Sequence, residues 1–78
     1  MKFLTILGST GSIGVHTLDV IRQHPDRFSV IALTAHHNIE LLFKQCLQTM
    51  PSYAVVGTEP LAKNLQQRLR EQSLKTKV

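Results

Sequence analysis

Three short apolar runs alternate along the chain with stretches in which apolar and polar residues mix. The runs cover Phe3–Leu7, Phe28–Leu33 and Tyr53–Val56. Nearly every position in them is apolar, and a glycine or a polar turn follows each one, which is typical of strands buried on both faces of a parallel sheet. We therefore expect three β-strands in these places.

The mixed stretches carry apolar residues at helical spacing. They predict helices over residues 12–24 and 39–50, each closed by a proline, because the residue before a proline is pushed out of helical geometry. Asn38 is suited to cap the second helix through its side-chain oxygen. That helix has one continuous apolar face, formed by Ile39, Leu42, Phe43, Cys46, Leu47 and Met50.

A third helix is predicted over residues 59–73. Thr58 offers a hydroxyl cap, and Pro60 suits the first turn. The apolar stripe of this helix is narrow and consists of Leu61, Leu65 and Leu69 beside Ala62. The pattern leaves the other side in water, including Gln66, Gln67, Arg70 and Glu71.

The order of these elements predicts the fold class. Strands and helices alternate as β-α-β-α-β-α, and parallel strands joined by right-handed crossovers lie in the spatial order 3-2-1 with helices covering the faces of the sheet. We expect an α/β structure that forms, over residues 1–78, the N-terminal half of a Rossmann-like doubly wound domain. A complete domain continues with a fourth strand beside the first. We expect Lys75–Val78 to approach that strand, so that the chain is a fragment of a longer enzyme.

Composition narrows the function classes. The 78 residues carry a formal charge of +4, but the basic residues gather late in the chain without the interleaved aromatic residues of single-strand binders. We therefore expect no nucleic-acid partner. No apolar run approaches the roughly 20 residues of a membrane span, and no signal peptide precedes the first strand. We expect no membrane partner and a cytoplasmic protein, and the lone Cys46 fits a reducing compartment.

A glycine triplet follows the first predicted strand and opens the first predicted helix. Gly8, Gly11 and Gly14 suit, in that order, a tight turn, close approach of backbone to phosphate, and close packing of the helix on the sheet. The helix N-terminus offers N–H groups to an anion, and the loop has neither an acidic residue nor the lysine of a P-loop. We predict that the loop binds the pyrophosphate of a dinucleotide, through Thr10, Gly11, Ser12 and Ile13.

The turn after the second predicted strand favours NADP over NAD. NAD-binding domains usually place an acidic residue about 20 residues past the loop, whereas this chain has His36, His37 and Asn38 there. A carboxylate would repel the additional phosphate of NADP, while two imidazoles and an amide can donate to it. The alternative is an exposed polar turn without a ligand, with Asn38 serving as a helix cap alone.

The sequence shows no catalytic constellation. His16 and His24 have no serine, cysteine or carboxylate at a spacing that suggests a relay, and the five acidic residues are dispersed. Metal-ligand clustering is missing as well. We assign no catalytic residue and no metal ligand to this chain.

A highly specific pattern fills the first part of the chain, with LTILGSTGSIG at Leu4–Gly14 and TLDVI at Thr17–Ile21. The pattern resembles the N-terminus of the 1-deoxy-D-xylulose 5-phosphate reductoisomerase family, and the resemblance extends through Val30–Leu33, Asn38, Gln45–Cys46, Pro51 and Tyr53–Val55. In that family the segments matching Thr10 to Ile13 and His36 to Asn38 hold NADPH. The family often has glycine, then lysine or another polar residue, at the two histidine positions.

The resemblance implies an NADPH-dependent enzyme of non-mevalonate isoprenoid synthesis that converts 1-deoxy-D-xylulose 5-phosphate to 2-C-methyl-D-erythritol 4-phosphate. It implies a divalent metal, Mg²⁺ or Mn²⁺, and commonly a homodimer. The metal-binding and substrate-binding residues of the family lie beyond Val78, so we expect the chain alone to be inactive. The alternatives are a free-standing nucleotide-binding module that regulates a partner, and a basic nucleic-acid binder.

Overall fold

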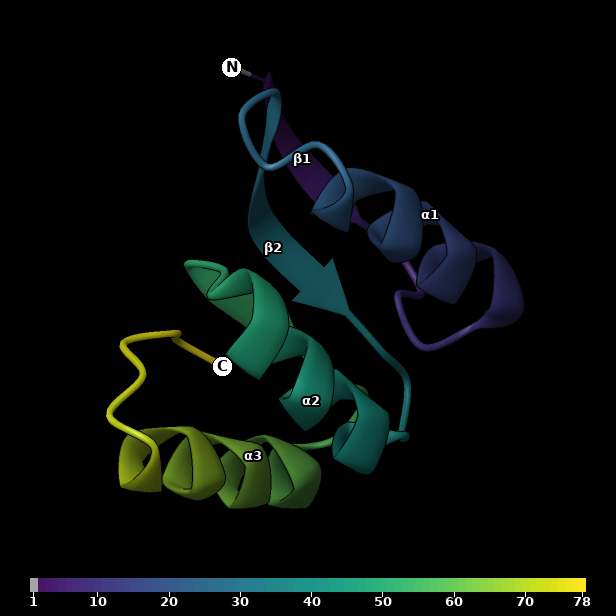
Figure 1. The fold of residues 1–78 in the computed structure, drawn as a ribbon. Coiled ribbons are helices and arrows are strands. Elements are labelled where there is room, and N and C mark those ends of the chain that lie inside the picture. The colour runs from purple at the N-terminus through teal and green to yellow at the C-terminus, as the bar shows by residue number, and fades with distance from the viewer. Residues whose placement is uncertain (1) are drawn as a thin grey trace.

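The computed structural model describes residues 2–78 and contains three strands and three helices in strict alternation (Figure 1). Every predicted element is present, with no end shifted by more than two residues, which confirms the α/β class. The elements are β1 Lys2–Ile6, α1 Ser12–Arg22, β2 Phe28–Thr34, α2 Ile39–Thr49, β3 Tyr53–Val55 and α3 Glu59–Glu71.

The sheet is parallel, with the strand order β1-β2-β3. This is the predicted order 3-2-1 counted from the other edge. The pairing of β1 with β2 changes register once, between Leu4 and Thr5, and Ile31 is the extra residue on β2 at this bulge. The extra residue shifts the side-chain alternation of the rest of β2 by one position. Val30 and Leu33 therefore enter one core, although strict alternation would place them on opposite faces.

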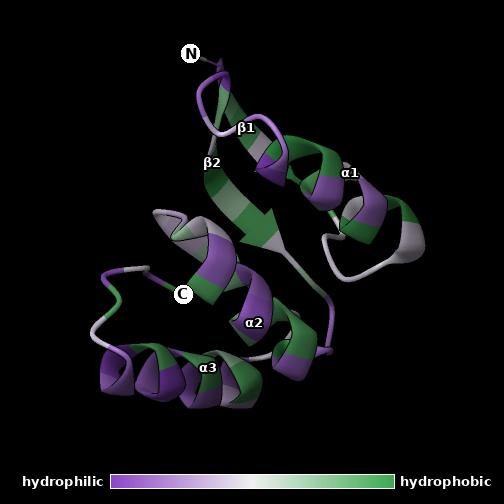
Figure 2. Ribbon diagram, viewed as in Figure 1, coloured by the Kyte–Doolittle hydropathy of each residue, from purple (hydrophilic) through white to green (hydrophobic). Residues whose placement is uncertain are grey.

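All three helices pack on one face of the sheet, so the expected covering of both faces is not seen among residues 2–78. Ala54 of β3 is fully buried, whereas its neighbours Tyr53 and Val55 are 52% and 53% exposed. A single apolar core contains residues from all six elements, and β2 is the most continuously apolar of them (Figure 2). The three helices share this face because right-handed connections that step the same way across a sheet all lie on one side of it.

The predicted apolar face of α2 is buried at its centre but not at its end. Leu42 and Cys46 are fully buried, whereas Leu47 and Met50 are 39% and 70% exposed. Burial raises the pKa of the Cys46 thiol to about 11, so the thiol stays protonated at neutral pH. The buried side of α2 also includes Gln45, which is only 4% exposed. The helix is thus turned towards the loop after β1, where this amide finds partners.

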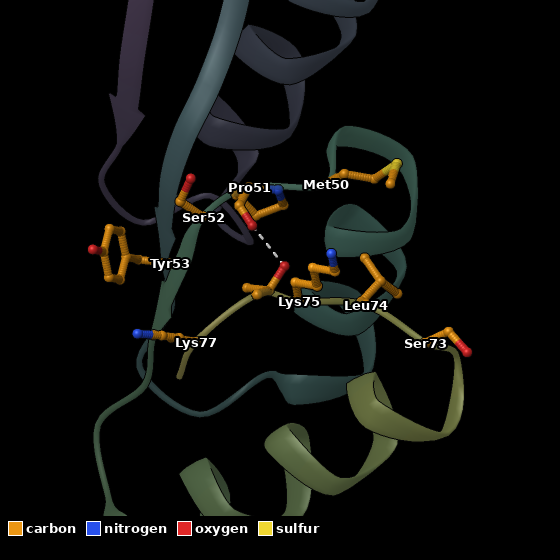
Figure 3. A pocket seen from close by; sticks show the side chains of 9 residues that line it. Met50, Pro51, Ser52, Tyr53, Ser73, Leu74, Lys75 and Lys77 are labelled. Carbon is orange, nitrogen blue, oxygen red and sulfur yellow. Dashed lines mark hydrogen bonds between the residues drawn. The ribbon is translucent and has the colours of Figure 1, made fainter.

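The residues after α3 lie beside β3 and not beside β1, so that expectation is wrong (Figure 3). Lys77 forms a parallel bridge with Tyr53, and its carbonyl accepts from the Ala54 N–H at 2.8 Å. The Thr76 hydroxyl donates to Pro51 O at 2.6 Å. Since α3 shares the face of the other helices, a right-handed crossover from β3 continues outwards and reaches the free edge of β3.

One side chain of α3 and the N-cap residue before it differ from their expected roles. Gln66 is not left in water, because its Nε2 donates to Thr76 O at 3.1 Å and its Oε1 accepts from the Val78 N–H at 3.1 Å. The Gln66 amide thus bonds to a backbone acceptor and a backbone donor of the terminal segment, as the backbone of a neighbouring strand would. Thr58 is the N-cap residue, but its hydroxyl makes no capping bond. Pro60 explains this in part, since a proline in the first turn has no N–H to donate to a cap.

One ion pair links α2 to α3. Arg68 donates to both carboxylate oxygens of Glu40, at 2.9 and 3.1 Å, and its guanidinium lies 4.6 Å from the centre of the Phe43 ring. The hydrogen bond from Arg68 and the charge of its guanidinium lower the pKa of Glu40. The carboxylate is exposed, so salt screens much of this attraction.

We predict that Glu40→Gln flattens the acid limb of the stability curve. A carboxyl group whose pKa is lower in the folded protein stabilises it above the ordinary value of 4.5, and that contribution is lost as the pH falls through the lowered pKa. The difference in melting temperature between the unmodified chain and the variant should be largest above about pH 5 and shrink towards about pH 2. A constant difference over this range would contradict the role given to Glu40.

Candidate nucleotide-binding site

The turns after β1 and β2 lie together at the carboxyl edge of the sheet. The Gly8 N–H donates to Thr34 Oγ1 at 2.8 Å, and the Ser9 N–H donates to Thr34 O at 2.8 Å. One residue at the end of β2 therefore joins the glycine loop to the turn that contains His36. In doubly wound folds, dinucleotides bind at this edge.

Two of the three glycines in the triplet are required by the local geometry. Gly8 has a φ of +64°, a left-handed conformation that glycine adopts without cost. A Cβ on Gly14 would lie 2.3 Å from Gly8 O, whereas a Cβ on Gly11 would lie 3.4 Å from the same oxygen. Gly14 therefore allows α1 to pack against the turn itself, and not against the sheet as predicted.

The start of α1 presents free backbone donors. The N–H groups of Ser12, Ile13 and Gly14 have no hydrogen-bond acceptor within the described chain, and no acidic residue lies in the first turn of the helix. The Gly11 N–H, which the sequence predicts to face a phosphate, donates instead to Gly8 O at 3.0 Å. An anion at this helix end would meet the free N–H groups and the positive end of the helix dipole.

The residues predicted to bind pyrophosphate are not all in one place. Gly11, Ser12 and Ile13 line an open groove of about 670 Å³ at the end of β1. Ser12 and Ile13 are exposed, whereas Thr10 is half-buried and does not line the groove. The structure thus brings three of the four predicted residues to one surface.

His36, His37 and Asn38 form an exposed turn after β2. The two imidazole rings lie edge to face, with their centroids 5.5 Å apart. Asn38 Oδ1 accepts from the Leu41 N–H at 3.2 Å, so Asn38 caps α2 as predicted. His36 O accepts from the Gly57 N–H at 2.8 Å, which ties the backbone of this turn to the end of β3 and leaves the rings exposed.

Three residues that hold these turns were not predicted from the sequence, namely Ser9, Thr34 and Gln45. Ser9 is fully buried and makes two hydrogen bonds of 2.7 Å to Gln45 of α2. A glutamine beside an apolar helix stripe was the available signal, because a buried amide requires partners. The sequence could not show that the partner lies in the glycine loop.

Another cavity lies at the opposite end of β3. It is bordered by the turn between α2 and β3 and by the residues after α3, including Met50, Tyr53, Lys75 and Lys77 (Figure 3). Because it lies at the amino end of β3, it is remote from the carboxyl edge where the two turns meet. It therefore takes no part in the candidate site.

Metal-ligating side chains do not cluster in the described part of the chain. Among residues 2–78, no three His, Cys, Asp or Glu side chains lie together in a way that could hold a metal ion. None of the helices in this range is both long and apolar enough to cross a bilayer. The site therefore offers hydrogen-bond donors to an anion without an assembled metal centre beside them.

Comparison with known proteins identifies the family of this chain. The family model for 1-deoxy-D-xylulose 5-phosphate reductoisomerase matches residues 4–78. The chain belongs to this family. The reductoisomerases of Janthinobacterium sp. (strain Marseille) and Tolumonas auensis are 56% and 53% identical to it over 78 residues, which is all of this chain and 20% of each relative.

Solved structures of reductoisomerases share the fold. A crystal structure of DOX-P reductoisomerase in complex with NADPH, fosmidomycin and magnesium has a TM-score of 0.92 at 34% identity and covers 99% of this chain. The reductoisomerase from Zymomonas mobilis in complex with NADPH has a TM-score of 0.89 at 37% identity and covers 97% of this chain. This chain corresponds to 19% and 20% of those two structures, about a fifth of their length.

The glycine contacts predict unequal effects of alanine in the loop. Gly14→Ala would press a Cβ against backbone atoms of Gly8 and Ser9, which cannot swing aside, so we expect a loss of roughly 2 kcal/mol or more in the free energy of unfolding. Gly11→Ala meets only an ordinary contact and should cost less than about 1 kcal/mol. Denaturant unfolding of both variants measures the difference, and equal losses would contradict the assignment.

Proposed function

We propose that this chain is the NADPH-binding part of a 1-deoxy-D-xylulose 5-phosphate reductoisomerase. The observation that carries the proposal is the joining of two anion-suited turns through Thr34, one with free N–H groups and one with the imidazoles of His36 and His37. Membership of the family and the NADPH complexes of two solved relatives support it.

The glycine loop is proposed to hold the pyrophosphate of NADPH. The N–H groups of Ser12 and Ile13 donate to it, and Gly11 allows the phosphate to approach the backbone. The hydroxyls of Thr10 and Ser12 are additional donors. The first turn of α1 has no acidic residue to repel the charge, so the residues present fit a dianionic group.

The turn after β2 is proposed to hold the 2′-phosphate. The rings of His36 and His37 and the amide nitrogen of Asn38 can donate to it, and no carboxylate stands in this turn. The hydrogen bond from the Gly57 N–H to His36 O fixes the backbone of this turn. The family often has glycine at the position of His36, and in this chain the imidazole ring makes the contact with the phosphate instead. When bound, NADPH supplies the hydride for the reduction, and these residues bind and orient it.

The activity belongs, in this proposal, to the whole reductoisomerase. That enzyme converts 1-deoxy-D-xylulose 5-phosphate to 2-C-methyl-D-erythritol 4-phosphate with a divalent metal, in the cytoplasm and as a homodimer. Residues 2–78 hold no metal-binding cluster, and we infer that they bind the cofactor while catalytic and metal-binding residues come from elsewhere in the enzyme. The 78-residue chain alone is then inactive.

Ligand-dependent melting separates this function from a free-standing regulatory nucleotide module. A ligand at 100 times its Kd adds about 2.7 kcal/mol to the stability of the protein that binds it. We expect NADPH to raise the melting temperature more than NADH does, and ATP to raise it little. A larger shift with ATP would favour the regulatory module, and no shift with any nucleotide would contradict cofactor binding by this chain.

The histidines predict a preference for NADPH over NADH. The rings of His36 and His37 can donate hydrogen bonds to the 2′-phosphate, which NADH lacks. Replacing both histidines by alanine removes these donors and should bring the Kd values for NADPH and NADH closer together, whereas His24→Ala, at an exposed histidine outside the turn, should not. Binding titrations that find equal Kd values for the two cofactors in the unmodified protein would remove the histidines from this role.

A further inference from the structure

We propose that Gln45 is a positioning residue that sets the affinity for NADPH by holding the glycine loop in its binding orientation. This inference rests on the proposed function. Gln45 lies on α2, and the residue it holds, Ser9, stands 36 positions earlier in the chain. Neither side chain faces the groove beside Gly11 and Ile13, so Gln45 acts on the site through the backbone of the loop.

Both ends of the Gln45 amide bond to Ser9. The Ser9 hydroxyl donates to Gln45 Oε1 at 2.7 Å, and Gln45 Nε2 donates to Ser9 O at 2.7 Å. Ser9 is fully buried and Gln45 is 4% exposed, so water does not compete for these bonds. On its other side Ser9 donates its N–H to Thr34 O at 2.8 Å. All the polar groups of Ser9 are therefore engaged inside the protein.

The bond to Ser9 O fixes the peptide group between Ser9 and Thr10. In a trans peptide the C=O and the N–H point in opposite directions, and the chain has no cis peptide among residues 2–78. Because Ser9 O points to Gln45, the Thr10 N–H points the opposite way. That N–H has no acceptor in the described chain. The Gln45 amide thus fixes the backbone of the loop shortly before the free N–H groups at the start of α1.

The loop has little stiffness of its own to keep this orientation. Gly8 and Gly11 flank the two residues concerned, and glycine permits backbone rotations that other residues resist. If this peptide turned over, the backbone that leads into α1 would change direction, and the free N–H groups of Ser12 and Ile13 would move with it. A binding site that is competent for only a fraction of the time binds its ligand more weakly by that fraction. Losing the Gln45 amide should therefore weaken NADPH binding.

Three substitutions in the full-length reductoisomerase that contains these residues separate the two bonds. Gln45→Met keeps the length of the side chain and removes both bonds. Gln45→Glu keeps an acceptor for the Ser9 hydroxyl but presents no donor to Ser9 O when ionised. Ser9→Ala removes the hydroxyl bond and leaves the bond to Ser9 O in place. Gln48→Met is the matched control, because Gln48 is exposed on the same helix.

The readouts are the Kd for NADPH, measured well below the melting temperature, and the KM values of both substrates. We expect Gln45→Met and Gln45→Glu to raise the Kd and the KM for NADPH about tenfold or more, with the KM for the sugar phosphate unchanged. Ser9→Ala should raise them by less than about threefold, and Gln48→Met should leave them unchanged. If Gln45→Met does not fold, the comparison of Gln45→Glu with Ser9→Ala still tests the hydrogen bond from Gln45 to Ser9 O, on which the proposal depends.

The proposal is overturned if the Gln45 variants melt at lower temperature but bind NADPH as tightly as the unmodified protein. It is also overturned if Ser9→Ala weakens binding as much as Gln45→Glu, since the fixed carbonyl would then be irrelevant. An unmodified protein that does not bind NADPH at all is a different failure, which removes the proposed function itself. The NADPH titration of the unmodified protein therefore distinguishes the two.

Discussion

The hydrogen bonds that Thr34 makes to the turn after β1 are the constraint on which the candidate site depends. They hold Gly8 and Ser9 at the end of β2, so the loop cannot move independently of the sheet. Gly14 then packs against the backbone of the same turn, which fixes where α1 begins and where its free N–H groups point. From the other side, Gln45 closes the arrangement through Ser9.

The direction of the crossovers decides the rest of the architecture. Because each connection steps the same way, all three helices share one face, and the segment that follows α3 joins the edge of β3. The other face of the sheet leaves Phe3, Tyr53 and Val55 more than half exposed. One apolar core therefore supports the whole described chain, and the carboxyl edge that carries both turns stays open.

The predictions that succeeded and those that failed differ in the kind of side chain involved. Leucine positions such as Leu42 and Leu65 were correctly placed in the core, because apolar spacing reports burial directly. Gln45 and Gln66 were missed for one reason. Each side-chain amide bonds to backbone groups, those of the glycine loop for Gln45 and those of the terminal segment for Gln66. Hydropathy alone assigns a glutamine to the solvent-facing side of a helix.

The sequence by itself determined the order and type of the elements, the parallel strand order, the phosphate-suited glycine loop and the family, because these follow from local spacing and from motifs that are contiguous in the chain. Tertiary structure decided that the helices share one face and that the chain returns to β3. It also decided that Gly11 uses its N–H inside the turn and that Gln45 holds Ser9. These features depend on contacts between residues that are distant in sequence, and a local sequence pattern does not indicate which distant residue a side chain contacts.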